Sequence, residues 1–379
     1  MTTSSKILQF VLQPPVPLSS SPLSDFERTL RGFASQSTLL ALASSRQQLT
    51  VATRALVLSN NRRRYDDNDN DSRKNVVSAA VDAARTYHTK WNAFLANTLA
   101  VHGDSSRLRT QSSDPMSFPW HIPLLSHEEG SVLFADASVL FESACASLAL
   151  AASLQAVGSD EALREGASLL RTTANESILV HFRPRIATSV RRVREPHIFS
   201  AAVFEAYAHG LEGQRAVAAV TTEEHSKCIL ALFSASAHYR RALDLLPADS
   251  ALSTERAQVT ARARYHLAHA LAEGPGEFGV AIACLEEALN GLARSRQRRG
   301  INDKNVDADA DVLMHTVAST LKKLQRLNET AAFQPIPSRN ALTMRIDRTG
   351  AIRSLTVEHP DEDDPTIVCV VIPNAIAAQ

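Results

Sequence analysis

The stretch YHLAHALAEGPGEFGVAIACLEEALNGL, Tyr265 to Leu292, decides the fold. Apolar residues recur at helical spacing in two runs, and a Gly-Pro-Gly sequence at 274–276 separates them. Glycine gains backbone freedom outside a helix, and proline lacks the amide hydrogen that a helix needs, so this sequence ends one helix before the next begins. The stretch therefore predicts a helical hairpin, with helices over about 250–273 and 277–297.

The second helix of this hairpin carries an A-x3-L-x2-A-L pattern, which is typical of tetratricopeptide repeats. A related sequence, YRRAL, begins at Tyr239, and LEEAL begins 46 residues later, at Leu285. A true tetratricopeptide array repeats about every 34 residues. The chain is therefore expected to contain one or two hairpins of this type inside a larger, irregular helical fold.

The same periodicity extends over most of the chain and predicts an all-α fold. Residues 6–18 read as a short strand or extended arm that ends in prolines, and Ser24 or Asp25 is a candidate cap for the first helix. Besides the hairpin, the predicted helices cover about 25–60, 75–101, 128–157, 159–182, 197–219, 222–246 and 309–328.

Two segments depart from the helical pattern. The charged sequence RRRYDDNDNDSRK, residues 62–74, contains too little apolar surface to pack and predicts a disordered loop insertion. After Glu329 the helical period stops, and residues 341–379 predict a β-hairpin with Gly350 in its turn, followed by a third strand and a tail. We expect one helical domain over 1–340 and this small β segment after it.

The composition limits the classes of function. The 379 residues are 44% hydrophobic, which suffices for a sizeable core, and forty basic residues balance forty acidic ones. A neutral chain has no overall field that attracts nucleic acid. No apolar run is long enough for a membrane span, and the four cysteines form no CxxC pair, as expected of small buried residues in a reduced cytoplasmic protein.

Motifs for catalysis are absent from the sequence. It contains no P-loop, dinucleotide-binding fingerprint, nucleophile elbow or HExxH motif. His266 and His269 lie one helical turn apart, but they alternate with Leu and Ala on an ordinary packing face. We therefore expect no enzyme activity, no cofactor and no metal site; a hydrolase or metal enzyme is the third-ranked alternative.

Two features favour binding. In CILALF, Cys228 to Phe233, every position of a helical turn and a half is apolar, so this part of the helix is either buried on all sides or lines a groove that another helix fills. The loop RPRIATSVRRVREP is rich in arginine and is either a solvated connector or a contact for acidic lipid headgroups or an acidic partner. The arginines concerned are Arg183, Arg185, Arg191, Arg192 and Arg194.

Several motifs, in this order, resemble the Bro-one domain, the helical domain found in Alix and in stand-alone Brox-like proteins. FPWHIPLLSHEEGSVLFADASVLFESACASLALAAS is similar to the family's F-x-W loop and the helix that follows it. Glu142 stands where the family usually has Asn. The matching residues are Phe118, Trp120, Val139, Leu140, Phe141 and Ala144.

Four later segments continue this resemblance, which covers about Ile7 to Pro337. EPHIFSAAVFEAYAHGLEGQRAVAAV is similar to the family's "LAQAQE" helix, with Glu212 on the matching Glu and Gln214 in place of a bulky aromatic residue. HSKCILALFSASAHYRRAL, the Tyr265–Leu292 hairpin and LNETAAFQPIP resemble the three segments that follow in the family. The arm and proline-rich tail of Alix have no counterpart.

The resemblance implies an elongated, curved helical domain that acts as a non-enzymatic adaptor. In the family, a hydrophobic pocket binds the C-terminal amphipathic helix of ESCRT-III subunits, the charged multivesicular body proteins of the Snf-seven type. Its aliphatic positions fall on Cys228 and Leu232, with Ile229 beside them and Gln214 at the aromatic position. The resemblance thus favours the groove over burial for CILALF, and it implies a cytoplasmic protein in endosomal sorting with peripheral recruitment to endosomes. The alternative is a helical scaffold of another complex that has lost this pocket.

Overall fold

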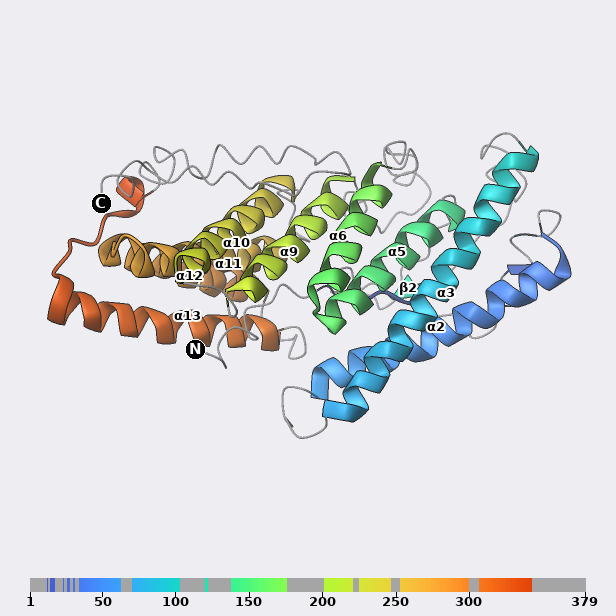
Figure 1. Cartoon of the computed structure of the whole chain (residues 1–379), viewed down its shortest axis with the longest axis horizontal. Coiled ribbons are helices and arrows are strands. Elements are labelled where there is room, and N and C mark those ends of the chain that lie inside the picture. The colour runs from blue at the N-terminus through green and yellow to red at the C-terminus, as the bar shows by residue number, and fades with distance from the viewer. Residues whose placement is uncertain are drawn as a thin grey trace. The chain divides into compact units, whose positions relative to one another are not determined.

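The computed structural model describes residues 12, 14–17, 23, 26–27, 30, 34–62, 70–102, 120–121, 138–175, 201–220, 225–246, 253–299 and 307–342. Almost all of these residues are helical, which confirms the prediction of an all-α fold (Figure 1). The predicted β segment over 341–379 lies outside the described residues, apart from the last helical turn at Ala341 and Leu342. None of the described helices combines the length and the apolar character that crossing a membrane would take.

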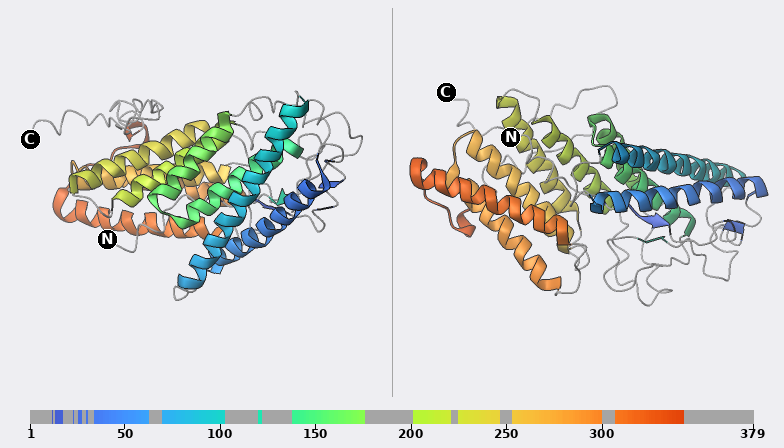
Figure 2. Two further views of the ribbon diagram at one scale, coloured as in Figure 1. Left: turned by 45° about the vertical axis from the view of Figure 1, so that its right-hand side comes forward. Right: turned by 90° about the horizontal axis from the view of Figure 1, so that it is seen from below.

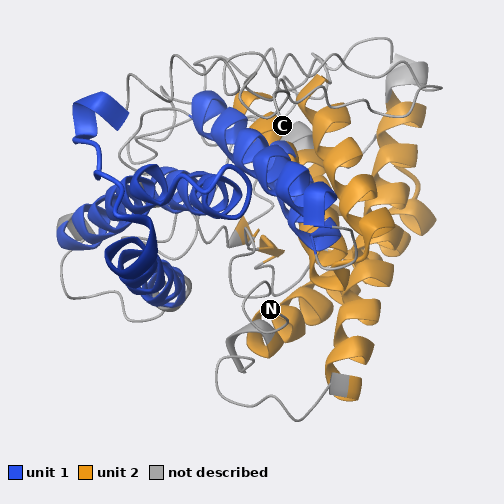
Figure 3. Ribbon diagram, turned by 60° about the vertical axis from the view of Figure 1, so that its left-hand side comes forward, with its two compact units in different colours: residues 1–10, 209–379 blue, residues 11–208 orange. Residues whose placement is uncertain are grey.

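The described residues divide into two compact units (Figure 3). Unit 2 contains the described residues from 12 to 208, and unit 1 contains those from 209 onward. The boundary falls inside α9 (Ala201–Ala219). The predicted curved shape, which depends on how the units are placed, stays a prediction, as does the single domain over 1–340.

Unit 2 is a series of antiparallel helices in chain order. They are α2 (Gln36–Arg62), α3 (Asn70–His102), α5 (Ser138–Val157) and α6 (Asp160–Asn175), and each packs against the next (Figure 1). Two short strands, β1 (Val16–Pro17) and β2 (Trp120–His121), pair antiparallel. The expectation of an extended segment near the N-terminus is therefore confirmed at Val16 and Pro17.

The helices α2 and α3 begin at positions that correct the sequence-based boundaries. The single helix expected over 25–60 is interrupted at Ala34 and Ser35, although Phe26, Glu27 and Leu30 before the break are helical. The Ser35 hydroxyl accepts a hydrogen bond from the backbone amide of Thr38 at 3.2 Å and so caps α2, whereas the expected caps Ser24 and Asp25 lie outside the described residues. The predicted loop over 62–74 is also too long, because α3 already begins at Asn70 with Asp71 in its first turn. A carboxylate there interacts favourably with the helix dipole. The remainder of that loop, 63–69, lies outside the described residues.

A buried charged centre joins four segments of unit 2. The carboxylate of Glu142 accepts hydrogen bonds from Arg46 Nε at 2.8 Å, from Trp120 Nε1 at 2.6 Å and from the Tyr87 hydroxyl. All four side chains are fully buried. Arg46 also lies over the Trp120 ring, 5.2 Å from its centroid. Burial, and then the Glu142 carboxylate, raise the pKa of Tyr87 well above its usual value, so its hydroxyl keeps the proton that it donates.

Unit 1 contains the predicted hairpin. After α9 come α10 (His225–Leu245), α11 (Ser253–Glu273), α12 (Phe278–Arg299) and α13 (Asp307–Leu327), and from α10 onward each helix packs against the next (Figure 2). The hairpin of α11 and α12 is confirmed, with ends close to those predicted. Its core combines one face of α11, most of the first three turns of α12 and the inner face of α13, with Ala268, Ile282, Leu285, Leu313 and Val317 almost fully buried.

The turn of the hairpin uses both glycines. The Gly274 amide donates to the Ala270 carbonyl at 3.0 Å, and the Glu277 amide donates to the Leu271 carbonyl at 2.9 Å, so the last carbonyls of α11 are satisfied. Gly276 has a φ of 70°, a conformation that residues with a Cβ rarely adopt. The Gly-Pro-Gly sequence thus sets both the end of α11 and the direction of α12.

The segment after α13 returns to this turn. A short π-helix, Asn328–Ala332, ends at Phe333, which has a φ of 52° and a side chain that is 75% exposed. The Gln334 side chain donates to the Gly276 carbonyl at 2.8 Å and accepts from the Gly279 amide at 3.1 Å. These two bonds hold Gln334, which follows the π-helix, against the α11–α12 turn.

Candidate partner-binding site

The first turns of α10 contain the predicted binding residues. Cys228 and Ile229 are half-buried, and Leu230 is 38% exposed. Three consecutive apolar side chains on a helix point in three directions, so together they surround the beginning of α10. We call Cys228, Ile229 and Leu230 the α10 apolar end. The sequence analysis did not single out Leu230, although it lies within CILALF.

Neighbouring elements hold two of these side chains. The Cys228 thiol donates a hydrogen bond to the Val220 carbonyl, just after the last residue of α9, at 2.9 Å. Ile229 packs against Gly274 in the hairpin turn, where a Cβ would lie 3.1 Å from the Ile229 Cγ2 and 2.9 Å from the Ala270 carbonyl oxygen. The glycine therefore lets Ile229 approach the turn closely. The α10 apolar end thus borders the end of α9 and the α11–α12 turn.

Two of the predicted binding residues are buried. Leu232, which the resemblance places in an open groove, is only 7% exposed, so at this residue the structure shows burial instead of a groove. Its position on α10 lies on the same side as the buried residues Ala235 and Tyr239, which explains its burial. Gln214 on α9 is 3% exposed. Neither side chain can contact a partner unless the surrounding side chains move.

Aromatic and histidine side chains further along α10 connect it to α9 and α11. His209 on α9 and His238 on α10 share a hydrogen bond between their Nδ1 atoms at 3.3 Å. The Tyr239 ring stacks on His266 of α11, with the ring centroids 5.7 Å apart. A Cβ at Gly213 would lie 3.0 Å from the Tyr239 ring, so the absence of a side chain at Gly213 leaves room for this ring. This part of the unit is well packed and positions α10 relative to α9 and α11.

The histidines of α11 are structural neighbours of these rings. His266 is buried, and desolvation, with smaller electrostatic contributions from the neighbouring His269 and Arg262, lowers its pKa to about 3, so the ring is neutral. The His269 Nδ1 lies 3.6 Å from the Glu273 carboxylate, one turn along the helix. Over the part of the chain that the structure describes, no group of three or more metal-binding side chains comes together.

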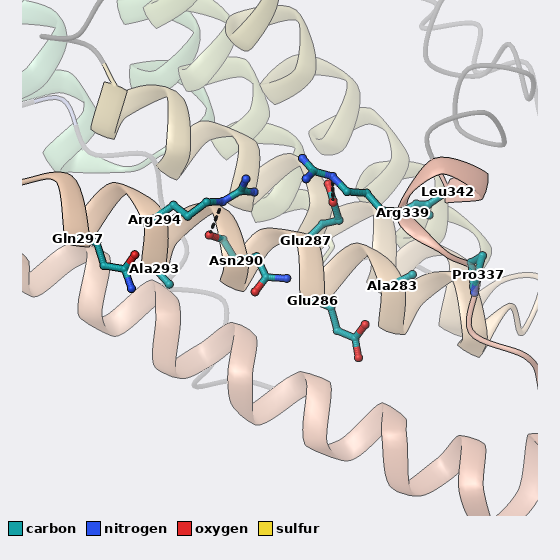
Figure 4. Close-up of a pocket in the computed structure, with 10 residues that line it drawn as sticks. All are labelled: Ala283, Glu286, Glu287, Asn290, Ala293, Arg294, Gln297, Pro337, Arg339 and Leu342. Atoms are coloured by element: carbon teal, nitrogen blue, oxygen red, sulfur yellow. Dashed lines mark hydrogen bonds and ion pairs between the residues drawn. The ribbon is translucent and has the colours of Figure 1, made fainter.

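A shallow cavity of about 450 Å³ lies in unit 1, between α12 and the segment around Arg339 (Figure 4). The Arg339 Nε lies 2.6 Å from the Glu287 carboxylate inside it, and the Arg294 Nε donates to the Asn290 carbonyl at 3.1 Å. The charges of Arg339 and Glu287 are therefore already paired with each other. The residues that line the cavity are Ala283, Glu286, Glu287, Asn290, Ala293, Arg294, Gln297, Pro337, Arg339 and Leu342.

The predicted basic contact cannot be placed. Arg183, Arg185, Arg191, Arg192 and Arg194 lie outside the described residues. Their contact with acidic headgroups or an acidic partner stays a prediction.

Of the cysteines, Cys145 and Cys284 are buried, as the sequence predicts, and burial raises the pKa of both thiols.

Comparison with known proteins gives a single kind of match. No family model matches the chain, and no curated protein matches it. One solved structure, described as "ALIX BRO1 CHMP4C complex", is 14% identical over 88% of this chain and 91% of that one, with a TM-score of 0.34. A likeness at this level assigns neither a family nor a partner to the chain.

Proposed function

We propose that the chain is a non-enzymatic adaptor that binds the C-terminal amphipathic helix of ESCRT-III subunits of the Snf-seven type at the α10 apolar end. In this proposal it acts in endosomal sorting, in the cytoplasm and recruited peripherally to endosomes. The observation that carries the proposal is the partial exposure of the consecutive apolar residues Cys228, Ile229 and Leu230 at the beginning of α10. The resemblance of the sequence motifs to the Bro-one domain supplies the class of partner.

An amphipathic helix suits this surface for physical reasons. Such a helix presents apolar side chains at i, i+3, i+4 and i+7, and these are the groups that displace water from exposed leucine and isoleucine. The α10 apolar end offers apolar contact around one helix end, with the edge of the α11–α12 turn beside it. Leu232 and Gln214 are then buried residues of unit 1 that do not contact the partner.

The test is a binding assay with Leu230→Asp. Leu230 points away from the buried side of α10, so a carboxylate there stays solvated in the free protein and the fold survives. On docking, the same carboxylate loses its water against an apolar helix, so binding should weaken by at least about 2 kcal/mol, which is more than tenfold in affinity. Retention of the chain on an immobilised ESCRT-III helix peptide measures this loss.

Two further variants make the assay specific. Leu327→Asp, on a leucine at the end of α13 that is 47% exposed, should bind the peptide as the unmodified chain does. Leu232→Asp should instead unfold or strongly destabilise the chain, because it buries an unpaired charge in the α10 interface. Equal loss of binding in Leu230→Asp and Leu327→Asp would contradict the proposed site.

The burial of Leu232 and Gln214 favours a second candidate function. If the pocket needs Leu232 at the surface, the chain is a helical scaffold of another cytoplasmic or trafficking complex that has kept the fold and lost the pocket. Peptide binding by the unmodified chain distinguishes the two functions. An adaptor is retained on the helix peptide before any substitution is made, and a scaffold of this kind is not.

A further inference from the structure

The outer face of α2 differs from that of an ordinary surface helix. Six exposed residues follow one another at alternating intervals of four and three along this face: Leu40, Ser44, Gln47, Val51, Arg54 and Leu58. Three of them are large apolar side chains, and they are 49%, 66% and 61% exposed at Leu40, Val51 and Leu58. We call these six residues the α2 stripe. A 4-3 spacing is the pattern by which two helices pack side by side.

The α2 stripe also contains almost no charge. The sequence of α2 has no Asp or Glu, and Arg54 is the one exposed charged side chain among the described residues 36–59. The neighbouring helix α3 shows the usual pattern, with exposed Asp71, Lys74, Asp82, Arg85 and Lys90 on its outer side. Solubility favours charge on a free helix face, whereas depletion of charge is the compositional mark of interface centres.

The spacing of the stripe is symmetric about Leu49, which faces the core. Leu40 and Leu58 lie equally far from this point, as do Ser44 and Arg54, and Gln47 and Val51. Leu40 and Leu58 are eighteen residues apart, which is about five helical turns, so both lie on one line along the helix. A face with this symmetry matches an identical face when the second helix runs in the opposite direction.

We propose that the α2 stripe is the interface of a homodimer, in which α2 packs antiparallel against α2 of a second copy of this chain. A twofold axis at the height of Leu49 places Leu40 against Leu58 of the second copy, Gln47 against Val51 and Ser44 against Arg54. A twofold interface uses the same patch on both subunits, which is the condition that the symmetric spacing meets.

Arg54, the single charged residue of the α2 stripe, favours an antiparallel over a parallel arrangement of the two helices. In the antiparallel arrangement the two Arg54 positions are ten residues apart along the axis, about 15 Å, so salt largely screens their repulsion. Each guanidinium can then donate to the hydroxyl of Ser44 in the other copy. In a parallel pair the two Arg54 side chains would face each other directly, with no carboxylate on either helix to neutralise them.

The size of the interface predicts a reversible dimer. Contact along five turns of a single helix pair is smaller than the roughly 1,200–2,000 Å² of a stable protein interface. We therefore expect monomer and dimer to coexist over concentrations of about 1 to 200 μM, the range in which such small interfaces form. Sedimentation velocity of the full chain over this range measures the dimer dissociation constant directly.

Substitutions in the stripe test the interface. Val51→Glu buries two carboxylates per dimer and should raise the dissociation constant at least tenfold, whereas Ala79→Glu, at an exposed position of α3, should change it less than twofold. Both variants change exposed side chains, so their melting temperatures should equal that of the unmodified chain. A monomer at every concentration, or a dimer that Val51→Glu leaves unchanged, would overturn the proposal.

A charge pair tests the orientation. Leu40→Lys and Leu58→Glu should each weaken the dimer, because each places one charge against a leucine of the second copy. Combined in one chain, they place opposite charges against each other twice per dimer and should restore most of the affinity. A parallel dimer would instead oppose like charges, so the combined variant would be weaker than either single one. That result would overturn the antiparallel arrangement.

Discussion

At the scale of single residues, Glu142 has the largest expected effect on stability. Its carboxylate is fully buried, and Arg46, Tyr87 and Trp120 donate to it from three other segments. Removing one partner of a buried ion pair leaves the other charge without compensation, and this typically costs about 3–5 kcal/mol.

We therefore predict that Glu142→Ala lowers the free energy of unfolding by about 3–5 kcal/mol. Glu165→Ala is the matched control, because Glu165 forms an ion pair with Arg85 at the surface, with both side chains more than two-fifths exposed. Exposed pairs contribute about 1 kcal/mol or less. Urea unfolding of both variants measures the difference, and equal losses would contradict the role of the buried centre.

His266 makes the stability of the chain depend on pH. Its pKa in the folded chain is lowered to about 3, whereas the unfolded chain has the ordinary value of about 6.5. The unfolded state thus binds the proton first as the pH falls, so this contribution is fully present above pH 6.5 and is lost between about 6.5 and 3.

We predict that this group alone removes about 2 kcal/mol of stability between pH 7 and pH 5. In His266→Phe the ring still stacks on Tyr239 but does not titrate, so the variant should lose less stability over this interval by about that amount. His315→Gln, at an exposed histidine on α13, should show the same pH dependence as the unmodified chain. Urea unfolding at the two pH values tests this, and an unchanged slope in His266→Phe would refute it.

At the level of helices and turns, two glycines of the α11–α12 hairpin should affect stability in opposite directions when each is replaced by alanine. Gly276 has a φ of 70° in otherwise open space, and Gly291 lies within α12 with nothing near its would-be Cβ. We predict that Gly276→Ala destabilises the chain by about 1–2 kcal/mol. Gly291→Ala should stabilise it by about 0.5–1 kcal/mol, because alanine is the better helix residue. Thermal unfolding of both variants shows whether the two shifts have opposite signs.

The helices were predictable because each has an apolar face of sufficient length. The ends of α10, α11, α12 and α13 fall within about three residues of the prediction, where loops rich in polar residues, glycine or proline flank them. The start of α2 was not predictable, since apolar residues recur on both sides of the break at Ala34 and Ser35, and only the structure shows that Ser35 caps a new helix there. The start of α3 was missed because charged residues such as Asp71 and Lys74 suit a solvated helical turn as well as a loop.

The candidate site was predictable only in part. The run of apolar residues in CILALF marked the region, but a run without alternation does not show which side faces the core. That depends on the neighbours of α10, which bury Leu232 and leave Leu230 exposed. The role of Glu142 was also missed, because its partners Arg46 and Tyr87 lie far away in the sequence.

At the scale of the whole molecule, each unit offers a different surface. Unit 1 presents the α10 apolar end, and unit 2 presents the α2 stripe. The two proposals stand on separate residues, so each can fail without the other. Val51→Glu should weaken the dimer at least tenfold and leave the affinity for the helix peptide unchanged, whereas Leu230→Asp should weaken peptide binding at least tenfold and leave the dimer unchanged. A variant that abolishes both would show that the two surfaces are coupled.

A fluorescence anisotropy titration shows whether the chain binds an amphipathic helix. The labelled peptide carries the C-terminal helix of an ESCRT-III subunit, and a matched peptide has serine at every apolar position of that helix. We predict that the chain binds the first peptide saturably and the second peptide with at least tenfold lower affinity. The Leu230→Asp variant should bind the first peptide at least tenfold more weakly than the unmodified chain does. No binding of the first peptide, or equal affinity for both, would contradict the proposed function.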